Sequence, residues 1–222
     1  YKRQEKYGAL FGTYFNRDDQ GRIIHEMSQG YPRPSLNTSR KILGFGVPPQ
    51  QLGIGASFRY KDWNASFLVE GKSGAQVFSG TNVRLIGYGL HQMTVPSGGR
   101  EAGFVPDGVL EDGTPITQSL DYTQQQNYWG RYNDVAEAGI YDSDYFRMRQ
   151  MSVGYTFPKT MLEGTFIQSA SVSLIGKNLF FIHNSVPNVD PESAYNSSNS
   201  QGLEFAGMPV PTTVGINVNL KF

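Results

Sequence analysis

The fold is decided by the last ten residues of the chain, which read Thr213-Val214-Gly215-Ile216-Asn217-Val218-Asn219-Leu220-Lys221-Phe222. Successive side chains of a β-strand point to opposite faces of the sheet. Every second residue from Val214 to Phe222 therefore falls on one face, and each of these residues is apolar. The residues between them, from Gly215 to Lys221, are small or polar. This alternation predicts a strand with one entirely apolar side.

Other parts of the chain alternate in the same way. The first of them has Leu52, Ile54, Ala56, Phe58 and Tyr60 on one face, with Gly53, Gly55, Ser57, Arg59 and Lys61 on the other. Where two such segments are joined by a short turn, as at Asp62, they are typical of an antiparallel hairpin. Helical periodicity is weak throughout. The sequence therefore predicts five strands, over residues 51–61, 63–73, 145–157, 167–178 and 213–222.

The connections between these strands differ in length in a regular way. Residues 61–63 and 158–166 make short turns, whereas 74–144 and 179–212 are long, and so is the segment 1–50 before the first strand. If the strands run up and down, both short turns lie at one end of the sheet. Outer-membrane barrels show this asymmetry, with short periplasmic turns and long extracellular loops. In a compact soluble domain, a connection as long as 74–144 would be uncommon.

The composition of the two faces favours the same class. A soluble sandwich buries its apolar faces, while a large barrel turns them toward lipid and lines its lumen with polar groups. Small uncharged groups fill the polar faces here, namely Gly53, Gly55, Ser57, Ser169, Ser171, Ser173, Gly215, Asn217 and Asn219. Such groups suit a crowded lumen. We therefore expect an all-β, antiparallel transmembrane β-barrel segment, with a soluble β-sandwich carbohydrate-binding module as the alternative.

Aromatic side chains gather near the ends of the predicted strands. They are Tyr60, Trp63, Phe157, Phe166, Phe180, Phe181 and Phe222. This distribution fits the aromatic girdles of membrane barrels, although aromatics at the edge of an ordinary core would look alike. Charged residues of the strands are expected to face the lumen or the periplasmic rim, because charge on a lipid face is costly. These residues are Arg59, Lys61, Glu70, Lys72, Lys177 and Lys221.

Composition excludes several classes of site. The chain has 222 residues, no cysteine, and 19 basic residues against 19 acidic ones. Without cysteine there are no disulfides, thiol nucleophiles or cysteine-based zinc sites. The formal net charge is zero, so the chain lacks the excess of positive charge that is typical of nucleic-acid binders. No apolar run approaches the roughly 18 residues that a transmembrane helix needs.

Several motifs together resemble the C-terminal part of SusC/RagA-type TonB-dependent transporters of Bacteroidetes. The resemblance covers essentially the whole chain and rests on order and spacing. One departure is Asp62, where a glycine is common after the Tyr-Lys pair. The matching segments are Tyr7-Gly8, residues 16–24, 42–48, 57–63 and 142–155, Gly176-Lys177-Asn178-Leu179-Phe180, Asp190-Pro191-Glu192, and residues 207–212.

The resemblance implies the last strands of a plugged barrel of about 22 strands in the bacterial outer membrane. Residues 1–50 would then be an extracellular loop region, and the plug and N-terminal domains would be absent from this chain. The implied function is TonB-dependent import of oligomeric nutrients, glycans or oligopeptides. The implied partners are the remainder of the barrel, a SusD-like surface lipoprotein held by loops 74–144 and 179–212, membrane lipid, and TonB acting through the absent N-terminal region.

The C-terminal strand carries a further implication of the resemblance. Barrel strands that end in an aromatic residue resemble the signal read by the barrel assembly machinery. The residues that would carry this signal are Gly215, Val218, Leu220 and Phe222. Because five strands cannot close a barrel or hide their edges, we expect the chain alone not to form a stable monomer.

Catalytic and metal sites find little support in the sequence. His25, His91 and His183 are far apart and lack the spacing of metal ligands. Carboxylate pairs such as Asp142 with Asp144, or Glu111 with Asp112, could suggest glycoside hydrolysis, but nothing beside them would raise one pKa. Asp190-Pro191-Glu192 supplies too few oxygens for calcium and is interpreted as a turn. We expect no enzyme, no cofactor and no metal.

The longest predicted loop contains a cluster of aromatic residues. Aromatic faces beside polar groups suit stacking on sugars or contact with peptides, and solutes arrive at the mouth of a barrel. The alternative is that these side chains pack the loop against its neighbours or against a partner protein. The candidate ligand contacts are Tyr122, Tyr128, Trp129, Arg131 and Tyr132.

Overall fold

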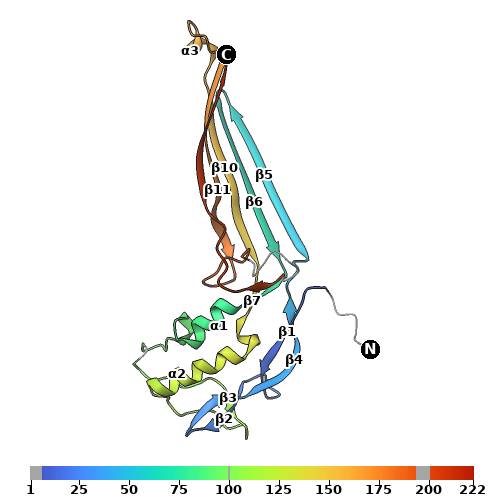
Figure 1. Cartoon of the computed structure of the whole chain (residues 1–222), viewed down its shortest axis with the longest axis vertical. Helices are drawn as coiled ribbons and strands as arrows, with labels where there is room; N and C mark the ends of the chain where they lie inside the picture. Colours follow the sequence, from blue (N-terminus) through green and yellow to red (C-terminus); the bar gives the residue numbers. More distant parts are fainter. Residues whose placement is uncertain (1–6, 100, 194–200) are drawn as a thin grey trace.

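The computed structural model describes residues 7–99, 101–193 and 201–222. Its main element is a five-stranded antiparallel sheet, here called the long sheet, which forms the upper part of the molecule in Figure 1. The strand order is β13-β11-β10-β6-β5. The bounds are β5 Gln50–Tyr60, β6 Trp63–Ser73, β10 Tyr145–Thr156, β11 Ser169–Asn184 and β13 Thr213–Lys221. Among the described residues, no helix is long and apolar enough to cross a membrane.

Four of the five strands lie within about two residues of the ranges that the alternation predicts. β11 differs, because it continues to Asn184, beyond the expected end at residue 178. Asn178 explains this difference: its φ is +51°, and the pairing with β10 shifts between Met148 and Gln150. This irregularity breaks the alternation in the sequence while the strand itself goes on.

The pairing register places the polar positions that the alternation predicts on one face of the long sheet. Gly53 pairs with Glu70, Glu70 with Arg147, Ser152 with Ile175, and Ser173 with Asn217. Carried along the strands, this register places the predicted charged residues Arg59, Glu70, Lys72, Lys177 and Lys221 on that single face, while Lys61 lies in a turn. These charges therefore share one face, and the expectation that this face lines a lumen stays a prediction.

The opposite face of the long sheet is apolar and open. Twelve of its large apolar side chains are between 39% and 73% exposed. A sheet that packed on a soluble core would bury these groups. They are Leu52, Ile54, Phe58, Tyr60, Trp63, Met151, Val153, Leu174, Val214, Ile216, Val218 and Leu220.

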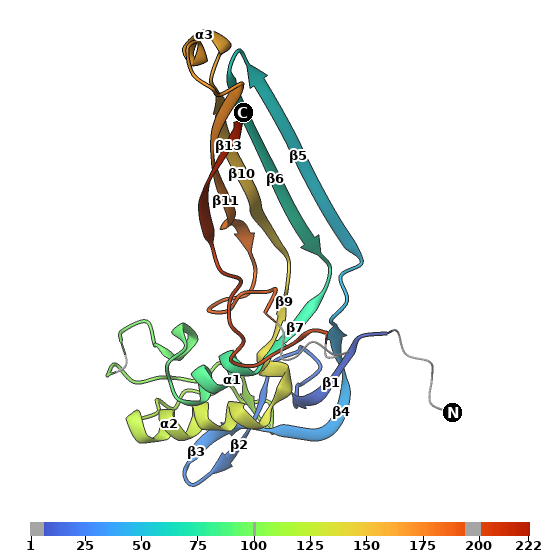
Figure 2. The same cartoon turned by 45° about the horizontal axis from the view of Figure 1, so that its top comes forward.

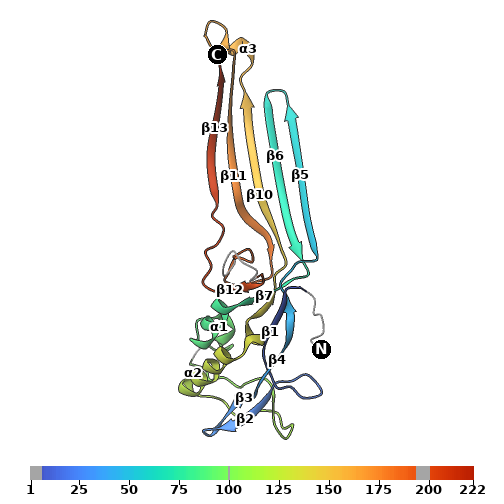
Figure 3. The same ribbon diagram turned by 45° about the vertical axis from the view of Figure 1, so that its right-hand side comes forward.

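Both short connections lie at the same end of the long sheet as the C-terminus (Figure 3). The β5–β6 hairpin turns through Lys61 and Asp62, and the β10–β11 connection contains the one-turn helix α3, Lys159–Leu162. Aromatic rings are in contact at this end. The ring centroids of Trp63 and Tyr155 are 5.0 Å apart, and the ring of Phe166 stacks on that of Phe222 with centroids 5.5 Å apart. Phe181 differs from the other predicted girdle residues, because its ring lies under the Arg147 guanidinium at 4.3 Å.

At the other end, the described residues of 7–49, 74–144 and 185–212 form a second unit, here called the loop region. Sequence periodicity gave no elements here, and residues 1–6, 100 and 194–200 of these segments lie outside the described part. Two of its strand pairs, β2–β8 and β7–β12, are parallel. Its strands are β1 Ala9–Phe15, β2 Ile24–Ser28, β3 Tyr31–Pro34, β4 Leu36–Phe45, β7 Gln76–Ser79, β8 Val109–Leu110, β9 Ile140–Asp142 and β12 Leu203–Glu204.

Helices α1, Gly80–Gly87, and α2, Tyr122–Gly130, lie side by side in the loop region (Figure 2). Each begins at a side-chain cap. Ser79 accepts from the Asn82 backbone N–H in α1, and Asp121 forms a capping box with Gln124 in α2. Such caps satisfy donors that the first helical turn leaves unpaired. Three short 3-10 helices accompany them, at Gln92–Thr94, Arg131–Asp134 and Ala136–Gly139.

A core of aromatic and aliphatic side chains holds the loop region together. It joins α1 and α2 to the first strand β1 and to β3, which are distant in sequence. Ring centroids of Trp129 lie 5.0 Å from those of Phe104, Tyr128 and Tyr132. The buried members are Phe15, Tyr31, Ile86, Leu120, Tyr128, Trp129, Tyr132 and Val135.

Candidate functional site

The two units meet at an ion-pair network on the polar face of the long sheet. Arg147 on β10 donates from Nη1 to Asp190 Oδ2 at 3.1 Å and to Glu192 Oε2 at 2.6 Å. Arg149, two residues on, donates to Glu192 Oε1 at 2.7 Å and to Glu70 Oε2 at 2.8 Å. The network therefore ties the 185–212 segment to two strands of the sheet.

Burial makes this network different from ordinary surface pairs. Arg147 is 4% exposed, and the side chains of Asp190 and Glu192 are 3% and 14% exposed. Tyr145 adds a hydroxyl donor to Glu192 Oε1 at 2.8 Å, and the Val210 backbone N–H donates to Asp190 Oδ2 at 3.1 Å. A buried charge is stable only when it is paired and hydrogen-bonded, as these groups are.

The 190–192 segment is a turn, as the sequence indicated, since the Ser193 N–H donates to the Asp190 carbonyl at 2.9 Å. It is also the acidic half of the network, which the sequence did not indicate. Burial opposes ionisation of Glu192, but hydrogen bonds from Arg149, Tyr145 and Arg147 outweigh it and lower the pKa of this carboxyl to about 2. Glu192 is therefore fully ionised at neutral pH.

A second carboxylate anchors the same segment to α1. Glu204 is 1% exposed, and it accepts hydrogen bonds from the hydroxyls of Ser79 at 2.6 Å and Thr81 at 2.7 Å. Both hydroxyls lie at the first turn of α1, where unpaired N–H groups favour negative charge. The 185–212 segment thus joins the long sheet at one point and the loop region at another.

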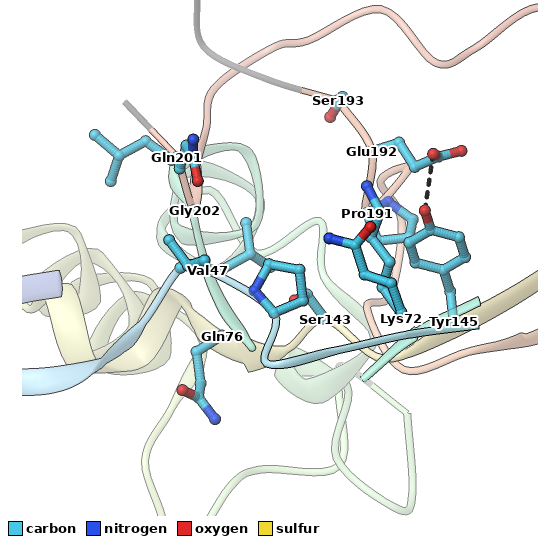
Figure 4. Close-up of a pocket in the computed structure, with 15 residues that line it drawn as sticks. Val47, Lys72, Gln76, Ser143, Tyr145, Pro191, Glu192, Ser193, Gln201 and Gly202 are labelled. Carbon is cyan, nitrogen blue, oxygen red and sulfur yellow. Dashed lines mark hydrogen bonds between the residues drawn. The ribbon is translucent and has the colours of Figure 1, made fainter. Parts of the chain in front are cut away.

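Beside the network lies a cavity of about 410 Å³, here called the junction cavity. Figure 4 shows Tyr145, Glu192 and Lys72 on one side of it, and Val47, Gln201 and Gly202 on the other. Lys72 belongs to the polar face of the sheet. Its amine has no ion pair with any residue that the structure describes. The junction cavity therefore offers the Lys72 amine, a tyrosine and several amide groups to a polar solute.

The aromatic candidates fall into different environments. Tyr128, Trp129 and Tyr132 are 2%, 6% and 7% exposed and belong to the core of the loop region, whereas Tyr122 is 81% exposed. The three buried rings therefore pack the loop against its neighbours, which is the alternative that the sequence left open. Their edges still line a cavity of about 450 Å³ together with Arg17. Contact of these residues with a ligand stays a prediction.

Arg131, the remaining candidate, lies at the C-terminal end of α2. Its guanidinium is 3.7 Å from Glu26 and 3.8 Å from Asp134. Both distances exceed those of a direct hydrogen bond. The structure therefore leaves Arg131 available to other acceptors.

The three histidines lie apart and have structural partners. His25 is buried, its Nε2 lies 3.1 Å from the Tyr128 hydroxyl, and burial lowers its pKa. His91 accepts from the Met93 N–H, and His183 Nε2 is 3.0 Å from the Ser185 hydroxyl. In the part of the chain that is described, no three histidine or acidic side chains are grouped as metal ligands.

The carboxylates considered for catalysis are engaged in holding strands together. Asp144 accepts from the Ser73 hydroxyl at 3.1 Å and from the Gly74 N–H at 2.7 Å, and Asp142 accepts from the Gln76 amide. Asp112 accepts from the Thr114 N–H in an exposed turn. Each of these carboxylates thus has a role in a turn or a strand junction.

Comparisons with known proteins agree with the resemblance seen in the sequence. No protein-family model matches the chain. A TonB-dependent receptor P3 from Formosa agariphila is 24% identical over 189 residues, which are 82% of this chain and 17% of the relative.

The fold is similar to that of the RagAB peptide importer. In its closed-closed state the TM-score is 0.61 at 12% identity, and in its open-open state it is 0.59 at 14% identity. These matches cover 96% of this chain and 23% and 22% of the solved chains. The chain therefore spans less than a quarter of the length of the proteins it matches.

The matched proteins are named as a receptor and an importer, which fits the expectation that this chain is not an enzyme. The long sheet is an antiparallel segment similar to TonB-dependent transporter barrels. In sequence motifs, in its curated relative and in fold, the chain resembles the SusC/RagA-type TonB-dependent transporters.

Proposed function

We propose that this chain supplies five strands and the adjoining extracellular loops of a TonB-dependent importer in the bacterial outer membrane. The observation that carries the proposal is the long sheet, with one open apolar face and one polar face set by a single register. Lipid would cover the apolar face, and the polar face would line the lumen. A soluble sandwich would need a second sheet over the apolar face, and the described residues do not cover it.

The orientation follows from the positions of the connections. The short connections and Phe222 lie at one end of the long sheet, which would be the periplasmic end, and the loop region lies at the other, facing outside. Edge strands β5 and β13 each pair on one side only. Strands from the remainder of the barrel would complete both edges, because open edges do not persist in lipid.

The substrates would be oligomeric nutrients, glycans or oligopeptides. The solved structures belong to a peptide importer, which supports import of an oligomer by the whole protein. Loops 74–144 and 179–212 would hold a SusD-like surface lipoprotein over the barrel. TonB would act on a plug domain of the whole protein.

The network at the junction would control the shape of the barrel mouth. Arg147 and Arg149 hold the 185–212 segment against the polar face, where a solute would pass. The junction cavity and Lys72, which lines it, lie beside this segment. Polar and charged groups of the solute would exchange contacts with these side chains on the way into the lumen.

A charge placed on either face of β13 tests the membrane assignment. Ile216→Arg puts a guanidinium on the apolar face, and Asn217→Arg puts the same group on the polar face of the neighbouring position. An arginine on the lipid face costs about 2–4 kcal/mol near the bilayer midplane. In the full-length transporter, I216R should therefore reduce insertion into the outer membrane strongly, while N217R should insert normally. Equal insertion of both variants would refute the assignment of the faces.

The exposed aromatic candidate provides a test of ligand contact that does not disturb the core. Tyr122→Ala removes a ring that is 81% exposed, so folding should be unaffected. If this ring contacts the solute, uptake of the oligomer by cells that carry Y122A should fall. Unchanged binding and uptake would remove Tyr122 from the site.

A further inference from the structure

A second polar cavity lies at the end of the loop region farthest from the long sheet. Its volume is about 480 Å³, and it is here called the tip cavity. It is lined by β3, by the residues at the end of α1 and by the segment that runs from α2 into the following 3-10 helix. The elements β3 and α2 lie together at the lower end of the molecule in Figure 1. The residues used below are Tyr31, Arg33, Gln126, Asn127, Arg131 and Asn133.

Three buried donors around the tip cavity have no acceptor. They are the Tyr31 hydroxyl, the Arg33 Nε and the Arg131 Nε, each without a hydrogen-bond partner among the described residues. Tyr31 is 3% exposed, so its hydroxyl has little access to bulk water. Buried polar groups in folded proteins are normally paired, and each exception calls for a missing partner.

The charge around the tip cavity points to the nature of that partner. The Arg33 guanidinium has no ion pair or hydrogen bond with any described residue. Arg131 has only the distant carboxylates of Glu26 and Asp134, whose side chains are 42% and 63% exposed. The three atoms without a hydrogen-bond partner among the described residues are donors, and two of them belong to arginine side chains. Such a set matches the oxygens of a carboxylate or a sulfate.

The other groups that line the cavity suit a sugar. Gln126 and Asn127 offer amide donors and acceptors of the kind that hydroxyl groups require. Asn133 already bonds the Gly130 carbonyl and Arg84, and its amide nitrogen keeps one further hydrogen to donate. Tyr88, which is 71% exposed, adds an open aromatic ring at the edge. The volume falls in the range of small-molecule sites, about 300–1,000 Å³. A concave cavity with a few convergent polar groups fits part of an oligomer better than a flat protein surface.

We propose that the tip cavity binds the oxyanion group, carboxylate or sulfate, of an acidic oligosaccharide that arrives from outside. Tyr31, Arg33 and Arg131 hold the oxyanion, while the amides contact the neighbouring hydroxyl groups. The inference rests on the proposed function, because it takes the loop region to be the first part of an importer that the solute meets.

Two variants of the full-length transporter, purified in detergent, test the proposal. Arg33→Gln removes one cation but keeps a polar group, and Tyr31→Phe removes only the hydroxyl. Arg40→Gln, an exposed position on β4, is the matched control. The probes are oligogalacturonate for the carboxylate, a sulfated malto-oligosaccharide for the sulfate, the neutral malto-oligosaccharide, and oligoglutamate. Calorimetry gives the dissociation constants.

The expected result is selective. R33Q should weaken binding of at least one acidic oligosaccharide about tenfold, as loss of a charge-assisted hydrogen bond does. Y31F should weaken it less, and R40Q should leave it unchanged. Raising the salt concentration should reduce the difference between wild type and R33Q, because salt screens charge. Thermal melting of each variant checks that it is folded.

Three results would overturn the proposal. The first is that the wild type and R33Q bind each acidic oligosaccharide with the same dissociation constant, or that neither protein binds either oligosaccharide. The second is loss of oligoglutamate binding alone, which would assign the cavity to acidic peptides. The third is loss of the lipoprotein partner from R33Q with acidic oligosaccharide binding unchanged, which would assign the cavity to the protein interface.

Failure of this inference can be told apart from failure of the proposed function. Membrane insertion of the Ile216→Arg and Asn217→Arg pair reports on the importer assignment and does not involve the tip cavity. If that pair behaves as expected while R33Q binds every probe like the wild type, the importer assignment stands and only the oxyanion site is rejected.

Discussion

The long sheet and the loop region are stabilised in opposite ways. Most large apolar side chains of the long sheet are exposed, and few are buried. The loop region, in contrast, packs its aromatic side chains into a core. Burial of apolar surface is the main favourable contribution to folding. The loop region therefore contains much of its own stability, while the described residues leave the apolar face of the sheet uncovered.

The ion-pair network joins these two regions, and removing Arg147 should have the largest effect on stability. Arg147→Ala leaves the buried carboxylates of Asp190 and Glu192 with fewer donors. Truncation of one partner in a buried pair costs about 3–5 kcal/mol. Thermal unfolding of the full-length transporter in detergent should show this loss.

A matched variant separates burial from charge. Arg59→Ala removes the same side chain from the polar face at a site where the guanidinium makes no ion pair with any described residue. It should change the melting temperature little. Equal effects of R147A and R59A would mean that the network contributes nothing particular to the junction.

The core of the loop region can be weakened without touching the sheet. Leu120 is 1% exposed, so Leu120→Ala should cost about 2–5 kcal/mol through lost burial and a cavity. If the two regions are stabilised separately, limited proteolysis should cut the loop region of L120A sooner while the barrel stays inserted. Loss of insertion in L120A would show that the loop region supports the sheet.

The sequence predicted the long sheet well because its signal is local. Alternation along each strand records which face of the sheet is apolar, and neighbouring residues such as Ile216 and Asn217 carry that information by themselves. Only the extension of β11 was missed, because Asn178 interrupts the pattern at a backbone irregularity.

The loop region and the network could not be read in the same way. In α2, the capping box of Asp121 and Gln124 is the one clear local sign, and the rings of Tyr128 and Trp129 pack on partners far along the chain. Arg147 and Glu192 are 45 positions apart, so no local spacing reports their pairing. Both residues lie in segments that carry the family resemblance, residues 142–155 and 190–192, and this resemblance was the only sign in the sequence that they matter.

The junction should also respond to pH. The pKa of Glu192 is about 2 in the folded protein, against an ordinary value of 4.5, so folding favours the ionised form. The contribution is therefore complete above about pH 4.5 and is lost as the pH falls toward 2. Glu192→Gln removes charge-assisted hydrogen bonds and should cost about 1–3 kcal/mol at neutral pH.

The comparison of pH profiles isolates Glu192 from other acidic groups. The stability difference between the wild type and E192Q, measured by denaturant unfolding, should be constant near neutrality and shrink between pH 4.5 and 2. A difference that stays constant down to pH 2 would contradict ionisation of Glu192 as the source.

The smallest expected effect lies at the opposite end of the sheet, in the β5–β6 hairpin. Lys61 has a φ of +52°, a region that side chains other than glycine rarely adopt, while Asp62 does not have a positive φ. Lys61→Gly should therefore stabilise the hairpin by about 1 kcal/mol or less, because glycine enters this region without steric cost. Asp62→Gly is the matched control and should destabilise it slightly, since glycine adds entropy to the unfolded chain. Because this turn is remote from the network, neither variant should alter the pH profile of the Glu192 contribution. Opposite signs for K61G and D62G in thermal unfolding would establish that the backbone of Lys61, rather than flexibility of the turn, limits the stability of this end of the sheet.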